Sequence, residues 1–270
     1  MQVALIGLGG IGASVGLAYQ HAALGDAVWG YDVDADAVQG ALAMGAIDQP
    51  IESVDACADA DVVVIATPPR VIPELLQQLA ARQRPDGVIT DVASVKHPIL
   101  AWSRAYLPYP NRFVGGHPIA GTERHGYRAA RADLFQGAQW VLTPTPETDA
   151  DALERVQRFV RAVRAVPIRM DAAQHDREFA LLSFLPHCLA FSLAALHAEN
   201  PTQLQGGGSW QSATRVARSD PDLWSHLLLL NREATLQWLN RLTEQLQQLQ
   251  DALQQGNQEQ LRALLQPIDD

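Results

Sequence analysis

Closely spaced glycines near the N-terminus are the first residues whose pattern indicates a chemical role. They form a G-x-G-x-x-G motif whose members are Gly7, Leu8, Gly9, Gly10, Ile11 and Gly12. The motif directly follows the strand-like run Val3–Ile6 and opens a helical pattern, which is the context that dinucleotide binding requires. Gly7 would permit the tight turn, Gly9 would let the backbone approach a pyrophosphate, and Gly12 would let helix and strand pack closely. The helix N-terminus would then donate amide hydrogen bonds to the phosphates.

An acidic residue further along the chain predicts which dinucleotide binds. Asp32 follows a second strand-like run and stands 20 positions after Gly12. A carboxylate there can accept hydrogen bonds from both ribose hydroxyls and would repel a 2′-phosphate. Because Tyr31–Val38 contains no arginine or lysine, we expect NAD rather than NADP. Thr67 and Pro68 end a later strand and are expected to line the same cleft, with an ordinary strand-to-helix turn as the alternative. The alternative for Asp32 is that it only caps the following helix.

Two polar segments follow later strand-like runs and hold further candidates. Thr90–Lys96 contains the only lysine of the chain, and Gly115–Glu123 contains His117 directly after two glycines. Both segments stand where strands end, which is the edge at which open α/β sheets bind ligands. A neutral imidazole with a pKa near the working pH can accept a proton from a substrate. Lys96 is expected to lie beside the cofactor, with a solvated lysine as the alternative.

Strand and helix patterns alternate along the first part of the chain. The strand-like runs are Val3–Ile6, Ala27–Tyr31, Val62–Ala66, Gly87–Asp91, Arg112–Gly115, Gln139–Leu142 and Val166–Met170. Helical patterns occur between them at Ile11–Leu24, Asp34–Met44, Pro69–Arg82 and Asp149–Val163. This alternation predicts an α/β fold, a Rossmann-type dinucleotide-binding domain with a mostly parallel sheet and helices on both faces.

The pattern changes after about Asp171, where strand signals stop and long helical patterns begin. They cover Ala172–Ala198, Asp222–Leu230, Arg232–Gln255 and Gln258–Leu265. We therefore expect a dinucleotide-binding domain over residues 1–170 and an all-helical substrate-binding and dimerisation domain over residues 171–270. Leucines of the third pattern recur at helical spacing and form one apolar stripe, which is typical of a core or a subunit interface. The apolar stretch Phe179–Ala198 contains a proline and a histidine, which favours a buried core helix over a membrane span.

Composition excludes several classes of function. The 270 residues carry a formal net charge of −10, and 47% of them are hydrophobic. An acidic chain repels phosphate backbones, so no nucleic-acid partner is expected. Cys57 and Cys188 stand far apart, which excludes a disulfide scaffold and a zinc ribbon and fits a reducing compartment. We expect no metal, no targeting segment and no membrane partner, and hence a cytoplasmic protein.

Further motifs extend the pattern over both parts of the chain. Besides the glycine turn, they are Thr90–Lys96, Gly115–Glu123, Val141–Thr145, Leu185–His187, Gly206–Gly208 and Thr214–Pro221 with Trp224. Together they resemble the prephenate/arogenate dehydrogenase family of tyrosine biosynthesis. The resemblance covers about residues 3–240 in the family's order, and its G-G-H-P-I-A-G-T segment is highly specific. It implies a small-molecule substrate and a homodimer joined through the helical domain.

The resemblance implies the oxidative decarboxylation of a cyclohexadienol acid. A hydride leaves ring carbon 4 for the nicotinamide, the ring carboxylate leaves as carbon dioxide, and the product is aromatic. Such a reaction needs a base on the 4-hydroxyl, a cation for a carboxylate and a dry pocket beside the cofactor. His117 matches the family's catalytic histidine. Ser94 matches the serine that hydrogen-bonds the substrate hydroxyl and that histidine, and a helix N-cap is the alternative role for Ser94.

The resemblance also implies a set of substrate-binding residues. Arg215 matches the family's substrate-binding arginine, and its guanidinium presents two parallel donors that suit a carboxylate. The others are His187, His175, Thr122, Glu123 and Trp224. For each of them the alternative is a structural or solvated residue. Relatives often carry Ser-His-Leu-Pro-His where this chain has Ser183–His187, so Phe184 replaces one histidine and any role of that histidine is lost or relocated.

The sequence leaves alternatives open for the substrate and for the function. Prephenate carries a keto acid and arogenate an amino acid, and Glu123 could favour arogenate by pairing with its ammonium group. A β-hydroxyacid dehydrogenase also joins a dinucleotide-binding domain to a helical one, but it uses a lysine early in the second domain, where this chain has none. A non-catalytic NAD-binding sensor would need none of His117, Ser94 and Arg215.

Overall fold

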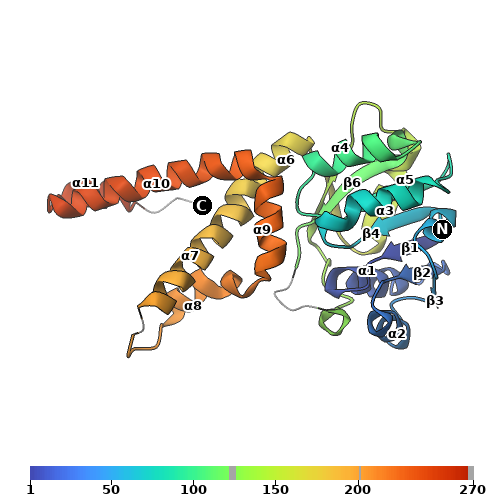
Figure 1. Ribbon diagram of the computed structural model, residues 1–270, viewed down its shortest axis with the longest axis horizontal. Helices are drawn as coiled ribbons and strands as arrows, with labels where there is room; N and C mark the ends of the chain where they lie inside the picture. The colour runs from blue at the N-terminus through green and yellow to red at the C-terminus, as the bar shows by residue number, and fades with distance from the viewer. Residues whose placement is uncertain (122–125, 201, 267–270) are drawn as a thin grey trace. The chain divides into compact units, whose positions relative to one another are not determined.

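The computed structural model describes residues 1–121, 126–200 and 202–266 (Figure 1). Its internal contacts divide it into two compact units. The first comprises Met1–Asp176 and Arg218–Leu230, and the second comprises Arg177–Ala217 and Asn231–Asp270. The first unit thus includes a helix, α9 (Pro221–Leu230), that lies beyond residue 170 in the sequence. A single domain boundary after residue 170 stays a prediction.

One sheet of eight strands organises the described part of the first unit. The strands are β1 (Val3–Ile6), β2 (Val28–Tyr31), β3 (Gln49–Pro50), β4 (Val62–Ile65), β5 (Val88–Asp91), β6 (Phe113–Pro118), β7 (Gln139–Thr143) and β8 (Val166–Arg169). Their order is β3-β2-β1-β4-β5-β6-β7-β8, and all neighbours pair in parallel except β6 and β7. The predicted mostly parallel α/β sheet is confirmed. The sequence did not predict β3, because two residues are too few to produce a strand pattern.

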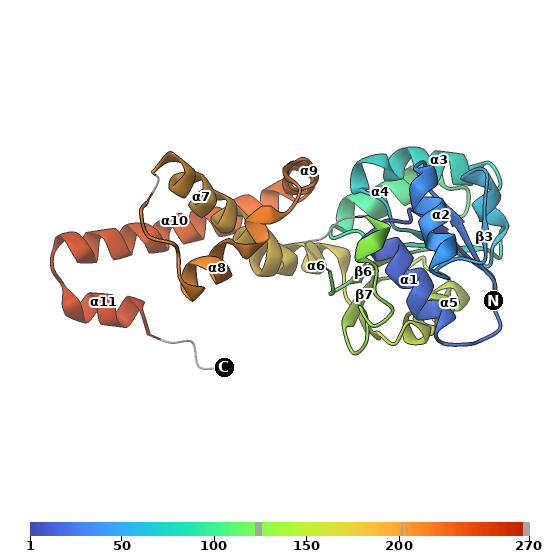
Figure 2. The same ribbon diagram turned by 90° about the horizontal axis from the view of Figure 1, so that it is seen from below.

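Helices cover both faces of this sheet. They are α1 (Gly10–Gln20), α2 (Ala35–Ala43), α3 (Ile72–Ala80), α4 (His97–Tyr106) and α5 (Ala150–Ala162). The first unit also contains the first part of α6 (Ala172–Phe179) and α9. Figure 2 shows α3 and α4 on one face and α1 and α5 on the other, and each pair packs together. Because both faces are covered, the apolar residues of β1 and β4 are buried along the whole strand. Val3 of β1 lies opposite Val28 and Val62, so the central strands begin in register.

The parallel strands bring the predicted functional residues to one edge of the sheet. β1, β2, β4, β5 and β6 run in the same direction, so the turns that follow them lie at a common edge. This edge holds the glycine turn after β1, Asp32 after β2 and Thr67 after β4. Ser94 follows β5, and His117 lies near the end of β6. The fold therefore gathers candidates that are widely separated in the sequence.

Helices form the described part of the second unit. They are the end of α6, a π-helical turn (Ala180–Phe184), α7 (Leu185–Glu199), α8 (Gly208–Thr214), α10 (Arg232–Gln254) and α11 (Gln258–Leu264). α10 packs against the π-helical turn and against α7, α7 packs against α8, and α10 packs against α11. α8 begins at Gly208, the last residue of the glycine motif Gly206–Gly208.

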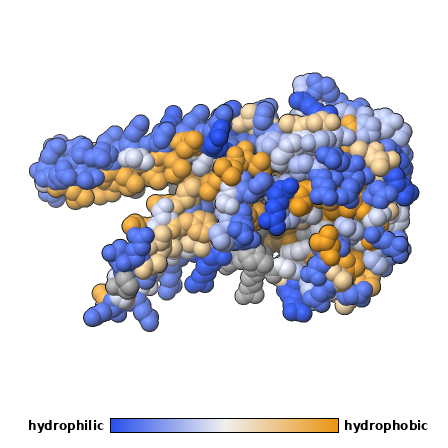
Figure 3. All heavy atoms as spheres, viewed as in Figure 1, coloured by the Kyte–Doolittle hydropathy of each residue, from blue (hydrophilic) through white to orange (hydrophobic). Residues whose placement is uncertain are grey.

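Apolar side chains of α7 and α10 are exposed in the single chain. Ala172–Glu199 is long and apolar enough to cross a membrane by length and composition alone, and only 17% of its most apolar window is buried. The expectation of a buried core helix is therefore wrong for the chain by itself. Figure 3 shows a hydrophobic band along α10. The exposed leucines of the two helices, 40–66% accessible, are Leu189, Leu196, Leu236, Leu246 and Leu253.

Candidate active site

The glycine turn after β1 has the geometry that its motif predicts. Gly7 has a φ angle of +95°, and a Cβ atom there would lie 2.5 Å from the carbonyl oxygen of Ala66. A Cβ atom on Gly12 would lie 1.8 Å from the carbonyl oxygen of Gly7, so α1 packs directly on the turn. Gly9 precedes α1 and has open space where a side chain would begin. The backbone is therefore accessible at the N-terminus of α1, where amide groups can bind phosphate.

A pocket of about 510 Å³ lies beside this turn. Its lining includes Gly7, Gly9, Asp32, Thr67, Pro68 and Arg70. The Thr67 hydroxyl is buried and has no hydrogen-bond partner among the described residues, so a ligand could provide one. Leu8 is buried behind the turn, while Gly10 and Ile11 begin α1 and are partly exposed. The open backbone and the unsatisfied hydroxyl fit a dinucleotide.

Asp32 connects the end of β2 with the glycine turn. Its Oδ2 accepts a hydrogen bond from the N–H of Leu8 at 2.6 Å, and its Oδ1 accepts one from the N–H of Asp34 at 2.9 Å. Each carboxylate oxygen has two lone pairs, so both can also accept a ribose hydroxyl. Asp34, not Asp32, caps α2, because its carboxylate accepts from the N–H of Asp36 at 3.0 Å. The backbone thus holds the Asp32 carboxylate in the pocket lining.

β6 carries His117 to the same sheet edge. β6 passes close to β5, since a Cβ atom on Gly116 would lie 2.5 Å from the carbonyl oxygen of Asp91. His117 is only 7% exposed. Burial above all, and then the neighbouring His175 and Lys96, hold the pKa of His117 well below its usual value. The ring is therefore neutral at neutral pH and able to accept a proton.

Lys96 is fully buried and ties the ends of two strands together. Its Nζ donates to Oδ2 of Asp91 and, at 2.6 Å, to the carbonyl oxygen of Gly116. Asp91 also accepts from the N–H of Ala93 at 2.9 Å and from the N–H of Gly116 at 3.0 Å. Burial lowers the pKa of Lys96, and the adjacent carboxylate opposes this shift. The ion pair fixes the backbone directly before His117, and the expected contact of Lys96 with the cofactor stays a prediction.

His175 and Asp176 lie in α6, next to His117. Nδ1 of His117 and Nε2 of His175 are 2.8 Å apart, with the two rings edge to face. Nδ1 of His175 lies 2.8 Å from Oδ1 of Asp176. The same carboxylate accepts from the N–H of Lys96 at 2.8 Å and from the N–H of His97 at 2.9 Å. The fold therefore brings two of the predicted histidines together, with His175 only 1% exposed.

The remaining predicted residues of the first unit are placed as follows. Ser94 is partly buried in the loop between β5 and α4, and its hydroxyl forms no hydrogen bond to another described residue. The N-cap of α4 is Lys96, so Ser94 does not hold that position. Trp224 is buried in α9. Thr122 and Glu123 lie outside the described residues.

Two predicted residues lie near each other in the second unit. His187 is half-buried, and its Nδ1 donates to the carbonyl oxygen of Ser183 at 2.8 Å. Burial lowers the pKa of His187, its hydrogen bond to Ser183 opposes the shift, and the cationic Arg215 lowers the pKa further. A neutral His187 therefore carries its lone pair on Nε2. Phe184, where relatives carry a histidine, is fully buried in the π-helical turn.

Sequence reasoning missed three polar residues of these clusters. They are Asp91 and Asp176, which bond the residues around His117, and Arg70 in the pocket lining. Two of them could have been found because they stand close to predicted site residues in the sequence. Asp176 directly follows His175, and Asp91 ends the strand before Ser94. Among the described residues, no group of three side chains could hold a metal ion.

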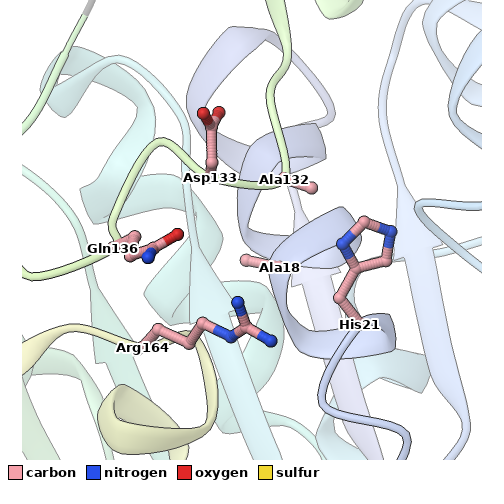
Figure 4. A pocket seen from close by; sticks show the side chains of 6 residues that line it. All are labelled: Ala18, His21, Ala132, Asp133, Gln136 and Arg164. Carbon is pink, nitrogen blue, oxygen red and sulfur yellow. The ribbon is translucent and has the colours of Figure 1, made fainter.

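A second, smaller pocket lies away from this edge. It is lined by Ala18, His21, Ala132, Asp133, Gln136 and Arg164 (Figure 4). Ala18 and His21 stand at the end of α1 opposite the glycine turn. Asp133 is exposed and already forms an ion pair with Arg131 at 2.9 Å. This pocket therefore contributes nothing to the cluster around His117.

Comparison with known families covers both parts of the chain. The model for the nucleotide-binding domain of prephenate dehydrogenase matches residues 15–169, and the model for its dimerization domain matches residues 171–267. A prephenate dehydrogenase of Bacillus subtilis is 32% identical over 266 residues, which are 96% of this chain and 72% of that protein. A cyclohexadienyl dehydrogenase of Zymomonas mobilis is 32% identical over 258 residues, covering 93% of this chain and 88% of that protein.

Solved structures of prephenate and arogenate dehydrogenases also match this chain. The prephenate dehydrogenase of Aquifex aeolicus in complex with hydroxyphenyl propionate and NAD+ matches with a TM-score of 0.91 and 30% identity, over 98% of this chain and 94% of that chain. The arogenate dehydrogenase of Synechocystis matches with a TM-score of 0.83 and 27% identity, over 98% and 96%. A 3-hydroxyisobutyrate dehydrogenase of Mycobacterium tuberculosis, at 17% identity and a TM-score of 0.57, shares the fold alone.

Proposed function

Because this chain belongs to the prephenate dehydrogenase family, we propose that His117 is the general base of its reaction and that prephenate, arogenate or both are its substrates. The chain is an NAD-dependent dehydrogenase that carries out oxidative decarboxylation in tyrosine biosynthesis. One observation carries the proposal for His117. It is a buried, neutral imidazole at the sheet edge that also holds the dinucleotide pocket.

The reaction requires a proton acceptor at the 4-hydroxyl of the substrate. Bound NAD supplies the acceptor for the hydride that leaves ring carbon 4. His117 takes the hydroxyl proton in that step and returns it to the same oxygen when carbon dioxide has left and the ring is aromatic. The imidazole thus ends the cycle unchanged. We assign to Ser94 a hydrogen bond that orients the substrate hydroxyl toward His117.

Binding of the substrate carboxylate requires a cationic side chain. Arg215 fills this role in our proposal, because a guanidinium can bond both oxygens of a carboxylate. His187 lies close enough to Arg215 for the cation to lower the pKa of His187, and it is proposed to contact the same substrate. Trp224, Thr122 and Glu123 are proposed to complete the substrate contacts, and Glu123 would favour arogenate if it meets the ammonium group.

The cofactor is NAD, and its binding is assigned to the pocket beside the glycine turn. The N-terminus of α1 would bind the pyrophosphate, and Asp32 would bind the ribose. Preference for NAD over NADP is a further proposal. The Asp32 carboxylate would repel a 2′-phosphate, whereas Arg70 in the same lining would attract one. We expect Asp32 to dominate, because the backbone holds its carboxylate and Arg70 is exposed.

Steady-state kinetics with two substrates and two cofactors test the proposed activity. The absorbance of the reduced cofactor should rise with NAD and at least one of prephenate and arogenate, and the ratio of the two kcat/KM values identifies the substrate. No reduction of NAD with either substrate would refute the activity. A β-hydroxyacid dehydrogenase is not favoured, because the only lysine of the chain, Lys96, is buried in an ion pair with Asp91.

We further propose that the chain forms a homodimer through α7 and α10. The exposed leucines of these helices form an apolar surface that association would bury, and the matched dimerization domain supports this. In sedimentation equilibrium, Leu246→Glu should shift the protein to monomer. Leu24→Glu, at an exposed leucine of the first unit, is the matched control and should leave a dimer. A monomeric wild type would refute the proposal of a homodimer.

A cytoplasmic location, without nucleic-acid or membrane partners, stays a prediction.

A further inference from the structure

We propose that His175 and Asp176 are positioning residues that hold His117 in the tautomer with its lone pair on Nε2. The inference rests on the proposed role of His117 as the base. It identifies the residues that determine which ring nitrogen of His117 carries the proton. The three side chains form a line from Asp176 through His175 to His117, with 2.8 Å between each pair of bonded atoms. All three are buried, at 6%, 1% and 7% exposure.

The proton positions follow from what each atom can donate or accept. An ionised carboxylate only accepts hydrogen bonds, so Nδ1 of His175 must carry the proton that it shares with Asp176. The Nε2 of a neutral His175 is then an acceptor. Because this atom lies 2.8 Å from Nδ1 of His117, Nδ1 of His117 must donate. A neutral His117 therefore carries its lone pair on Nε2, which is the nitrogen that can take the substrate proton.

Asp176 is itself held by a different part of the chain. Its Oδ1 accepts from the N–H of Lys96 and its Oδ2 from the N–H of His97, at the start of the ten-residue helix α4. Amide groups and the partial positive charge of a helix N-terminus both favour a negative charge at that place. The orientation of the carboxylate is thereby set by α4, although Asp176 belongs to α6.

The charges around His117 explain why an anion is needed there. The protonated ring would be buried, with the Lys96 ammonium group bonded to the carbonyl oxygen of Gly116, the residue before it. Asp91 pairs with that ammonium and is therefore engaged elsewhere. Asp176, reached through His175, is the carboxylate that can offset the positive charge that develops on His117 in the reaction. His175 and Asp176 thus act on the base, and we place neither in contact with the substrate.

Nitrogen-15 NMR of histidine-labelled wild-type enzyme tests the proposal without turnover. The expected result is a proton on Nδ1 of both His117 and His175, assigned by comparison with His117→Asn and His175→Gln. A proton on Nε2 of neutral His117 in the wild type would overturn the proposal. This measurement stays informative if neither prephenate nor arogenate is turned over, so failure of the activity and failure of the inference are distinguishable.

Asp176→Asn provides the kinetic test. With its NH2 group in place of Oδ1, the asparagine donates to His175, which reverses both hydrogen bonds and moves the His117 proton to Nε2. Its oxygen still accepts from the N–H of His97, whereas the N–H of Lys96 loses its acceptor. We expect kcat to fall by about 10²–10⁴-fold, the range lost with general-base catalysis, while KM changes little. Asp176→Glu should recover part of kcat, and the exposed Asp133→Asn should have no effect.

Two outcomes would overturn the role of Asp176. One is an unchanged kcat in Asp176→Asn. The other is a reduced kcat with a lower melting temperature and an unchanged His117 tautomer, because capping of α4 alone would then explain the effect. If Asp176→Asn does not fold, the wild-type tautomer decides the proposal by itself.

Discussion

Replacing Lys96 by methionine should lower the free energy of unfolding of the first unit by about 3 kcal/mol. Removal of one partner of a buried ion pair costs about 3–5 kcal/mol, because the other charge is left without its partner. Lys96 and Asp91 are both fully buried, so this range applies. We expect its lower end, since Asp91 keeps hydrogen bonds from the N–H groups of Ala93 and Gly116. Methionine has a similar length and brings no charge.

Denaturant unfolding measures this change as a shift of the midpoint. Arg104→Met is the matched control, because Arg104 pairs with Glu147 at 3.3 Å but both side chains are exposed, so the midpoint should not move. The double variant Asp91→Asn/Lys96→Met should recover part of the loss, because neither buried charge remains. If Lys96→Met unfolds at the same denaturant midpoint as Arg104→Met, the buried pair does not stabilise the strand ends.

Three further changes address the cofactor, the substrate and the pH dependence of folding. Asp32→Ser should lower the ratio of kcat/KM with NAD to kcat/KM with NADP, because it removes the charge that repels a 2′-phosphate; an unaltered ratio would show that Asp32 does not bind the ribose. Arg215→Ala should chiefly raise KM, with a loss of about 2–5 kcal/mol in binding, and an unchanged KM would locate the carboxylate contact elsewhere. Folding stability, measured as the denaturant midpoint, should fall as the pH drops below about 6.5, the ordinary histidine pKa. The pKa values of His117 and His187 are lowered in the folded state, so the unfolded chain binds more protons there. A midpoint that does not change under acidic conditions would contradict this sign.

Local patterns were sufficient to predict every strand of the sheet except β3, together with the residues at its edge. The strand run before Gly7 and the helical pattern after it fixed the position of the turn, because both are properties of neighbouring residues. The same logic located Asp32 and His117 at strand ends, and the parallel order of the strands then brought them to one edge. These predictions needed no knowledge of which residues meet across the fold.

Contacts between distant segments could not be predicted in this way. Substrate binding by His175 stays a prediction, but its contacts with His117 and Asp176 were not predicted. The α4 amides that hold Asp176 lie about 80 positions earlier in the chain. Lys96 was expected near the cofactor or in solvent, and its burial against Asp91 depends on the close approach of β5 and β6. The apolar pattern of α7 indicated burial, but a pattern cannot tell a core from a subunit interface.

The value of kcat for His117→Asn shows directly whether His117 is the general base. Asparagine keeps a hydrogen-bonding group near the backbone and removes the nitrogen that accepts the substrate proton. We expect kcat to fall by about 10²–10⁴-fold while KM for substrate and for NAD is largely kept. A variant with the kcat of the wild type would contradict the assignment of His117 as the base.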